Sequence, residues 1–150
     1  QGLLSFKFWS EDFFLISHRD RVSGGPGPVG AKEIDPEELM LLDEGHCLTD
    51  QALEICSIAS ESTLNTGASS LTTLVGLVGC NLGQTLVPEM ALVPLVNANP
   101  ELASSRLADP GPHREIAFLV RSNYANMASI ELLRDFFFDC LSKARGKSSL

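Results

Sequence analysis

The sequence predicts an α/β fold, and three observations lead to this class. Short apolar runs such as "FFLIS" (13–17) and "REIAFLV" (114–120) are typical of buried strands. Other segments, such as 69–79, carry apolar residues at helical spacing. The two kinds of segment alternate along the chain, as they do where helices join the strands of a largely parallel sheet. With 150 residues, 44% of them hydrophobic, the chain can build a sizeable core.

The first third of the chain contains a loop, a helix start and a strand. The glycine- and proline-rich segment "VSGGPGPVG" (22–30) predicts a loop, but it lacks the GK[ST] ending of a phosphate-binding loop, so we expect no nucleotide site there. In "DPEE" (35–38), Asp35 is a predicted N-cap and Pro36 occupies the first helical position. The apolar run "LMLL" (39–42) follows directly and predicts a buried strand.

The remaining elements follow from the same two periodicities. A helix is expected to begin between Cys47 and Thr49 and to run to about Ala59. A serine cap and the stripe Leu71, Leu74, Val75 and Val78 predict a helix over 69–79. We also expect strands at "STLNT" (62–66), "QTLVP" (84–88) and 114–120, a short helix at "PEMALV" (88–93) and a long amphipathic helix at "MASIELLRDFFFDCLSKA" (127–144).

Composition excludes several classes of function. The net charge is −8, from 11 Lys+Arg against 19 Asp+Glu, and only the tail "SKARGK" is basic. Nucleic-acid binding needs a basic face, so we expect no DNA binding by this chain alone. No apolar run approaches the roughly 18 residues of a membrane span, and no signal peptide is visible. Four cysteines are too few for a disulfide-stapled secreted domain, which favours a reducing, cytoplasmic setting. The start at Gln1, without an initiator Met, suggests a piece of a longer protein.

The stretch "GHCLTDQALEIC" (45–56) places two cysteines nine positions apart in a predicted helix. A continuous helix would separate Cys47 from Cys56 by about 13 Å. A disulfide needs Cα atoms within about 7 Å. The two cysteines are therefore either unrelated structural residues or a pair that meets only when the helix comes apart. Cys80 and Cys140 lie in apolar helical sequence and are expected to be buried packing residues.

Other chemistry finds little support. His46 and Cys47 are adjacent, which is poor spacing for zinc, and no CxxC or HxxxH supplies further ligands, so we expect no metal and no cofactor. A Cys–His hydrolase would need His18 or His113 as the base, and no segment suggests an oxyanion site.

A reactive Cys47 would need a cation from elsewhere in the fold. Thiolates are favoured at helix N-termini and beside cations. The local acidic residues oppose this effect; they are Asp43, Glu44 and Asp50. Without a distant cation, Cys47 would be an ordinary cysteine.

The segment "LMLLDEGHCLTDQALEIC" (39–56) resembles the redox segment of OxyR-type hydrogen-peroxide sensors, which belong to the LysR-type transcription regulator family. The family pattern there is a strand, an acidic turn, Gly-His-Cys-Leu, a basic residue, Asp-Gln-Ala and a second Cys nine positions after the first. Downstream, "ASSLTTLVGLVGCNLGQTLVPEMAL" (68–92) is similar to the helix and turn common to LysR-type effector domains, and "PHREIAFLVRSN" (112–123) to their return crossover. The resemblance covers nearly the whole chain.

The resemblance implies a fold of two α/β subdomains, like a type 2 periplasmic binding protein, behind an N-terminal winged helix-turn-helix. Residues 1–150 would be a partial regulatory domain. They would comprise the second subdomain, the crossover strand and the C-terminal helix, without the DNA-binding domain and most of the first subdomain. An apolar strand lacking its partner would then form an exposed edge.

The resemblance also implies residue roles. Cys47 would be the peroxide-reactive thiol and Cys56 its resolving partner, joined in a reversible disulfide. His46 and Asp50 fall on family positions around the reactive thiol, and Arg114 falls where the family carries a stabilising arginine. Thr49 stands where the family usually has a basic residue, which predicts a slower reaction of Cys47 with peroxide.

The function implied is the redox-sensing regulatory domain of a peroxide-responsive transcription activator, which is not an enzyme. Its partners would be hydrogen peroxide, thiol reductants of the glutaredoxin or thioredoxin type and a second copy of the chain in a homo-oligomer. DNA and RNA polymerase would be contacted only through the full-length parent, and no membrane is involved. The alternative is a LysR-type effector domain that binds a small organic ligand and carries incidental cysteines. A thiol peroxidase is a third interpretation, and it would consume many peroxides per chain where a sensor consumes one.

Overall fold

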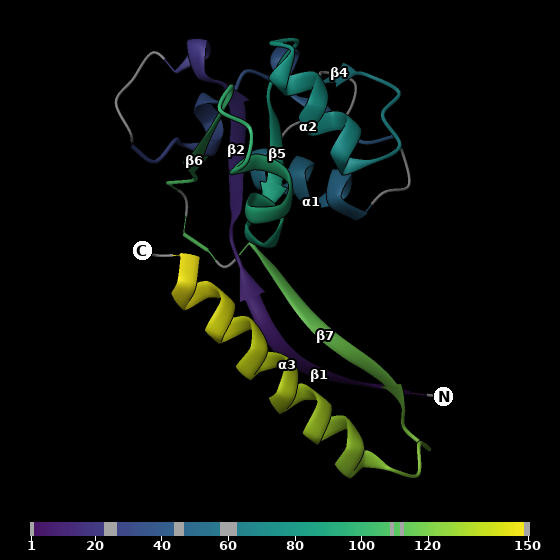
Figure 1. The fold of residues 1–150 in the computed structure, drawn as a ribbon. Helices are drawn as coiled ribbons and strands as arrows, with labels where there is room; N and C mark the ends of the chain where they lie inside the picture. Colours follow the sequence, from purple (N-terminus) through teal and green to yellow (C-terminus); the bar gives the residue numbers. More distant parts are fainter. Residues whose placement is uncertain are drawn as a thin grey trace. The chain divides into compact units, whose positions relative to one another are not determined.

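The computed structural model describes residues 2–22, 27–43, 47–57, 63–108, 110–111 and 113–148. The chain divides into two units: residues 11–113 form one, and residues 1–10 with 114–150 form the other. Figure 1 shows their elements along the chain. Each unit has its own sheet and is described by itself.

The sheet of the 11–113 unit is mixed. Its centre is β2 (Phe13–His18), which pairs antiparallel with β5 (Thr85–Pro88) on one side and with β6 (Leu102–Arg106) on the other. The short strands β3 (Met40–Leu41) and β4 (Leu64–Asn65) pair in parallel. A parallel bridge between Leu39 and Gln84 sets β3 beside the start of β5.

The expectation of a largely parallel sheet is wrong at its centre. β5 and β6 run in the same direction because each is antiparallel to β2, and the bridge gives β3 and β4 that direction too. Helical crossovers force neighbouring strands to be parallel, and α1 and α2 supply such crossovers between β3, β4 and β5. The described residues between β2 and β3 (19–22 and 27–39) contain no α-helix, so they place no such constraint on β2. β6 was not predicted, because "LASSR" is too polar to read as a strand.

The helices of this unit follow the predicted signals. α1 spans Cys47–Cys56, and α2 spans Leu71–Gly79 with Ser70 as its N-cap, whose hydroxyl accepts the Thr73 N–H at 3.2 Å. Asp35 caps as predicted, but it starts only a single 3-10 turn. The 3-10 turns are Arg19–Arg21, Ala31–Glu33, Pro36–Glu38 and Glu89–Ala91, and a π-helical turn covers Leu92–Val96.

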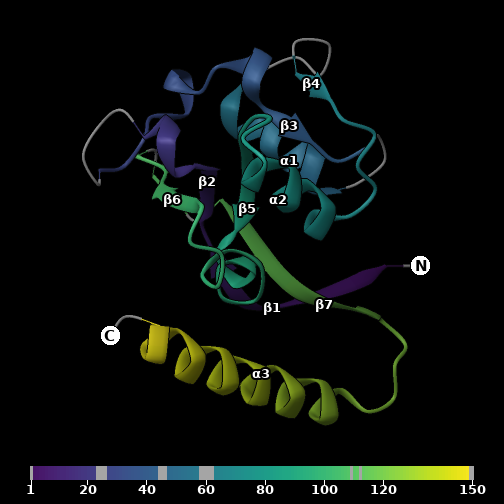
Figure 2. The same cartoon turned by 45° about the horizontal axis from the view of Figure 1, so that its top comes forward.

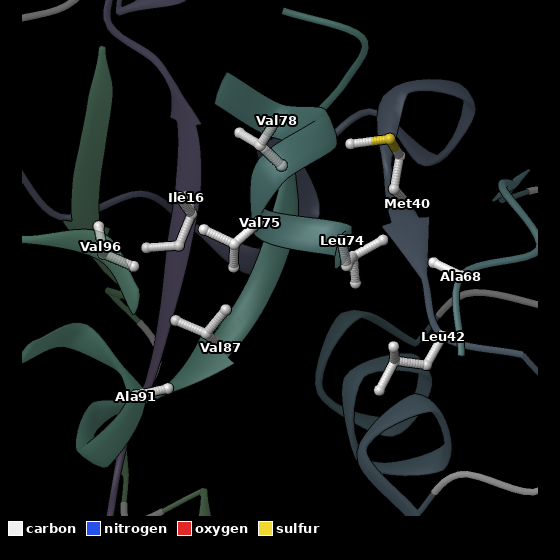
Figure 3. Close-up of a cluster of buried hydrophobic side chains, with 10 residues drawn as sticks. All are labelled: Ile16, Met40, Leu42, Ala68, Leu74, Val75, Val78, Val87, Ala91 and Val96. Atoms are coloured by element: carbon white, nitrogen blue, oxygen red, sulfur yellow. The ribbon is translucent and has the colours of Figure 1, made fainter. Parts of the chain in front are cut away.

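The two helices α1 and α2 cover opposite faces of the sheet. Alternation along β2 explains this, because Phe13 and Leu15 pack on the face that holds α1, whereas Ile16 packs on the face that holds α2. Figure 3 shows the α2 side of this core, where Val75 lies on the side of Ile16 and Val87, and Leu74 on the side of Met40 and Ala68. Its buried members are Ile16, Met40, Leu42, Ala68, Leu74, Val75, Val78, Val87, Ala91 and Val96.

The second unit consists of the two chain ends. β1 (Leu3–Glu11) pairs with β7 (Arg114–Arg121), and α3 (Met127–Ser148) runs alongside them (Figure 2). Phe8 stacks on Phe118 with ring centroids 4.6 Å apart, and Phe137 of α3 lies against both rings. Phe136 is 62% exposed, so the three consecutive phenylalanines do not share one core.

Two predicted packing residues are instead exposed. Cys80 directly follows the last residue of α2, and Cys140 lies on an exposed face of α3. Apolar neighbours in sequence do not ensure burial here, because Cys80 lies beyond the end of α2 and the phenylalanines that precede Cys140 are themselves exposed. Among the described residues, no helix is long and apolar enough to cross a membrane.

Candidate redox site

The helix α1 begins at one cysteine and ends at the other. Cys47 is exposed and Cys56 is only 5% exposed, and both are thiols. The predicted start of the helix is confirmed, whereas its end comes before Ala59 because Ser57 adopts a left-handed conformation with φ of 53°. Nine residues of α-helix separate the two Cα atoms by about 13 Å, too far for a disulfide.

One stripe of α1 is buried against the sheet. Thr49, Ala52 and Cys56 are 8%, 1% and 5% exposed, at the 3- and 4-residue spacing of one helix face. Ala52 and Cys56 belong to the cluster that holds Leu41 and Leu86. The larger side chains of the helix are half-buried against the same cluster; they are Leu48, Leu53 and Ile55. Cys47 lies outside the stripe, which explains why it is accessible and Cys56 is not.

The first turn of α1 is tied to β3 by a side chain. The Thr49 hydroxyl donates a buried hydrogen bond of 3.0 Å to the carbonyl of Leu42, the residue after β3. The next residue, Asp43, donates its N–H to the carbonyl of Ala68 at 3.0 Å. Sequence reasoning treated Thr49 only as a missing basic residue. The small residues at positions 49, 52 and 56 were the available signal, because their spacing marks the face that approaches a sheet closely.

The other predicted site residues are placed less closely. Asp50 is exposed in the first turn of α1, on the side of Cys47. His46 lies outside the described residues. Arg114 is the first residue of β7 and is partly buried in the unit formed by the chain ends. The structure therefore places Cys47, Thr49, Asp50 and Cys56 on one helix, with the two cysteines at its opposite ends.

The rival chemistries gain no support from the described residues. No group of three or more His, Cys, Asp or Glu among them could hold a metal ion. His18 lies between Asp20 and Glu101, at 3.5 and 3.4 Å from their carboxylates. His113 lies 3.3 Å from a carboxylate oxygen of Asp12. Both histidines considered as bases of a Cys–His hydrolase thus lie beside carboxylates, an arrangement that also occurs around catalytic histidines and does not decide their role.

Fold and site together define a class: an α/β domain that carries two cysteines at the ends of a helix covering its sheet. The family follows from comparison with known proteins. Residues 1–140 match the LysR substrate binding domain, and the chain belongs to this family.

Several known proteins are similar to this chain in sequence as well as in fold. A probable hydrogen peroxide-inducible genes activator of Streptomyces viridosporus is 39% identical over 88% of this chain and 43% of its own length. A cysteine mutant of OxyR from Corynebacterium glutamicum superposes with a TM-score of 0.85, at 28% identity, over 99% of this chain and 46% of that one. Another structure of a cysteine mutant of the same protein, with H2O2 bound, gives a TM-score of 0.83 at 30% identity over 95% of this chain and 46% of that one. The chain thus spans less than half the length of these relatives.

Proposed function

We propose that this chain is part of the redox-sensing regulatory domain of a peroxide-responsive transcription activator, and that it switches between a dithiol and a Cys47–Cys56 disulfide. The observation that carries the proposal is the bounding of α1 by one exposed and one buried thiol. The peroxide-inducible activators among the relatives support it.

The first step is oxidation of the exposed thiol. The Cys47 thiolate attacks one oxygen of hydrogen peroxide, and the O–O bond breaks. The sulfur loses two electrons and becomes a sulfenic acid, while the other oxygen leaves as hydroxide and takes up a proton to form water. Exposure of Cys47 lets peroxide reach the sulfur without any change in the fold.

The second step joins the two cysteines. The Cys56 thiolate attacks the sulfenic sulfur, an S–S bond forms, and the S–O bond breaks with release of hydroxide, which becomes water. This step needs α1 to open, because the helix holds the Cα atoms about 13 Å apart and a disulfide allows about 7 Å. A thiol reductant of the glutaredoxin or thioredoxin type returns the two electrons by thiol–disulfide exchange.

The remaining site residues have supporting roles in this proposal. By resemblance to the family, His46 and Asp50 would hold positions around the reactive thiol, and Arg114 would be the arginine that helps to stabilise the sulfur. Thr49 brings no charge where the family pattern has a basic residue, so we expect Cys47 to react more slowly than it would beside a cation.

The proposal assigns DNA binding to the parent protein. The net charge of this chain is −8, so its acidic side chains outnumber the basic ones that would neutralise DNA phosphates. A winged helix-turn-helix and most of the first subdomain would belong to the parent, which would act on DNA and RNA polymerase as a cytoplasmic homo-oligomer. Each oxidation is a signal rather than a turnover, so the domain is not an enzyme.

A peroxide titration of the reduced chain tests the proposal. After alkylation and peptide mapping, we expect one intramolecular Cys47–Cys56 disulfide from about one peroxide per chain, with Cys80 and Cys140 alkylated. In Cys56→Ser, a sulfenic acid at Cys47 should accumulate and react with dimedone. Cys80→Ser is the matched control and should behave as the unsubstituted chain does.

Three outcomes contradict the proposal. Oxidation of Cys80 or Cys140 before Cys47 would reject the assigned thiols. Consumption of many peroxides per chain with a thiol reductant would indicate a peroxidase. Stabilisation by a small organic ligand, without any peroxide-dependent disulfide, would indicate an effector domain with incidental cysteines.

A further inference from the structure

We infer that Thr49 is a positioning residue that sets the redox equilibrium of the cysteine pair, by fastening the first turn of α1 to β3 in the dithiol form only. This inference rests on the proposed disulfide switch. It gives a role to the one position where the redox segment departs from the pattern it otherwise follows.

The hydrogen bond from Thr49 to Leu42 acts as a latch, that is, a contact that holds α1 against the sheet in one redox form. Thr49 is 8% exposed, and its hydroxyl donates to the Leu42 carbonyl at 3.0 Å in a buried setting. A buried carbonyl that loses its donor keeps the full cost of its desolvation, so this bond matters more than an exposed one. Lysine or arginine at position 49 could not remain in so small and buried a place without a partner for its charge.

The acceptor side of the latch is rigid. Leu42 is buried in the cluster under α2, and it directly follows β3. Its neighbour Asp43 is held by a backbone hydrogen bond to Ala68 at 3.0 Å. The Thr49 hydroxyl therefore connects the segment between the cysteines to a fixed part of the sheet.

The latch acts on one redox form. Thr49 lies inside the ten-residue loop that a Cys47–Cys56 bond would close, and this loop cannot remain a regular helix. Opening the first turn of α1 separates the hydroxyl from Leu42, so the bond stabilises the dithiol and not the disulfide. Removing the hydroxyl must then shift the equilibrium towards the disulfide.

A glutathione redox buffer measures this shift. Two electrons and two protons pass from the Cys47 and Cys56 thiols to glutathione disulfide, which becomes two glutathione thiols, and the ratio of the forms gives the equilibrium constant. We expect Thr49→Val, which keeps the shape and loses the donor, to favour the disulfide by about five- to twentyfold. Thr49→Ser, which keeps the hydroxyl, should stay within about threefold of the parent sequence.

Thr85 provides a matched control within the same unit. Its hydroxyl also donates a buried hydrogen bond to a β3 carbonyl, that of Met40 at 2.8 Å, but from β5 rather than from α1. Thr85→Val should lower the unfolding temperature while leaving the redox equilibrium within about twofold. A similar shift in Thr49→Val and Thr85→Val would reduce Thr49 to a structural residue, and no shift in Thr49→Val would reject the latch.

Hydrogen exchange of the fully reduced protein separates this inference from the switch itself. Thr49→Val should speed exchange of the α1 amides at least threefold over Thr85→Val, whether or not a disulfide can form. If the parent sequence forms no Cys47–Cys56 disulfide, the proposed function and the redox role of Thr49 fail together. If it forms the disulfide and Thr49→Val matches it in both measurements, only the latch fails.

Discussion

Oxidation of Cys47 and Cys56 to a disulfide should unfold α1 and leave α2 folded. In the reduced chain, about six amides of α1, those of residues 51–56, have helical i→i−4 acceptors. Closing the disulfide shortens the span from Cys47 to Cys56 from about 13 Å to less than about 7 Å, so these bonds cannot persist together. On the chain-entropy model, closing the ten-residue loop lowers the conformational entropy of the open segment, and this loss amounts to roughly 2.5–3 kcal/mol of free energy. A helix this short is marginal without packing, and the burial of Ala52 is lost at the same time.

Amide hydrogen exchange followed by mass spectrometry tests this expectation. Exchange over residues 51–56 should accelerate at least about tenfold on oxidation, which corresponds to about 1.4 kcal/mol of lost local stability. The amides of α2 (Leu71–Gly79) should change little, since its face of the sheet is separate. Cys47→Ser, treated with the same peroxide, should keep the reduced pattern. A complete disulfide with unchanged protection over 51–56 would refute the reasoning.

Further expectations concern accessibility, stability and DNA. In the reduced, folded chain three cysteines should react quickly with an alkylating agent, whereas the 5% exposed Cys56 should react only as the protein opens, which mass spectrometry can time. Ser70→Ala removes the α2 cap and should lower the free energy of unfolding in urea by about 0.5–2 kcal/mol, with Ser70→Asp retaining most of it. Gly83→Ala should destabilise by about 1–3 kcal/mol, because a Cβ there would lie 2.7 Å from the Glu38 carbonyl oxygen. Gly76→Ala, in an open helical position, should instead stabilise by about 0.5–1 kcal/mol. A gel-shift assay at physiological salt should find no sequence-specific DNA binding by this chain in either redox state, and a salt-sensitive shift would contradict the domain assignment.

Local signals predicted the elements well and their pairing less well. The cap at Ser70, the stripe of α2 and the apolar run of β2 depend on neighbours in sequence, and the structure confirms all three. The direction of β2 depends instead on its place among the other strands of the sheet, and no local sequence pattern shows that place. β6 escaped prediction because its strand state comes from pairing with β2 rather than from its own polar composition.

The candidate site shows the same division. The spacing of Cys47 and Cys56 could be read directly, and the helix between them follows from its apolar periodicity. The buried hydrogen bond of Thr49 could not, because it depends on how the chain turns between β3 and α1 to bring the Leu42 carbonyl to the helix. The exposure of Cys80 and Cys140 was missed for a related reason: apolar neighbours in sequence do not fix the side of a helix on which a thiol lies.

The burial of Cys56 gives the proposed sensor a built-in delay. In the proposed switch, peroxide would reach Cys47 at the surface, whereas the disulfide would close only after the end of α1 leaves the cluster beneath it. Half-buried neighbours such as Leu53 and Ile55 would set how often that happens. Two domains with identical cysteines could therefore differ in how long an oxidant must persist before the signal is stored. Warming loosens the same packing, so heat and peroxide would act on one equilibrium, the opening of α1. Apolar residues that never touch an oxidant would therefore determine how readily the oxidised form is stored.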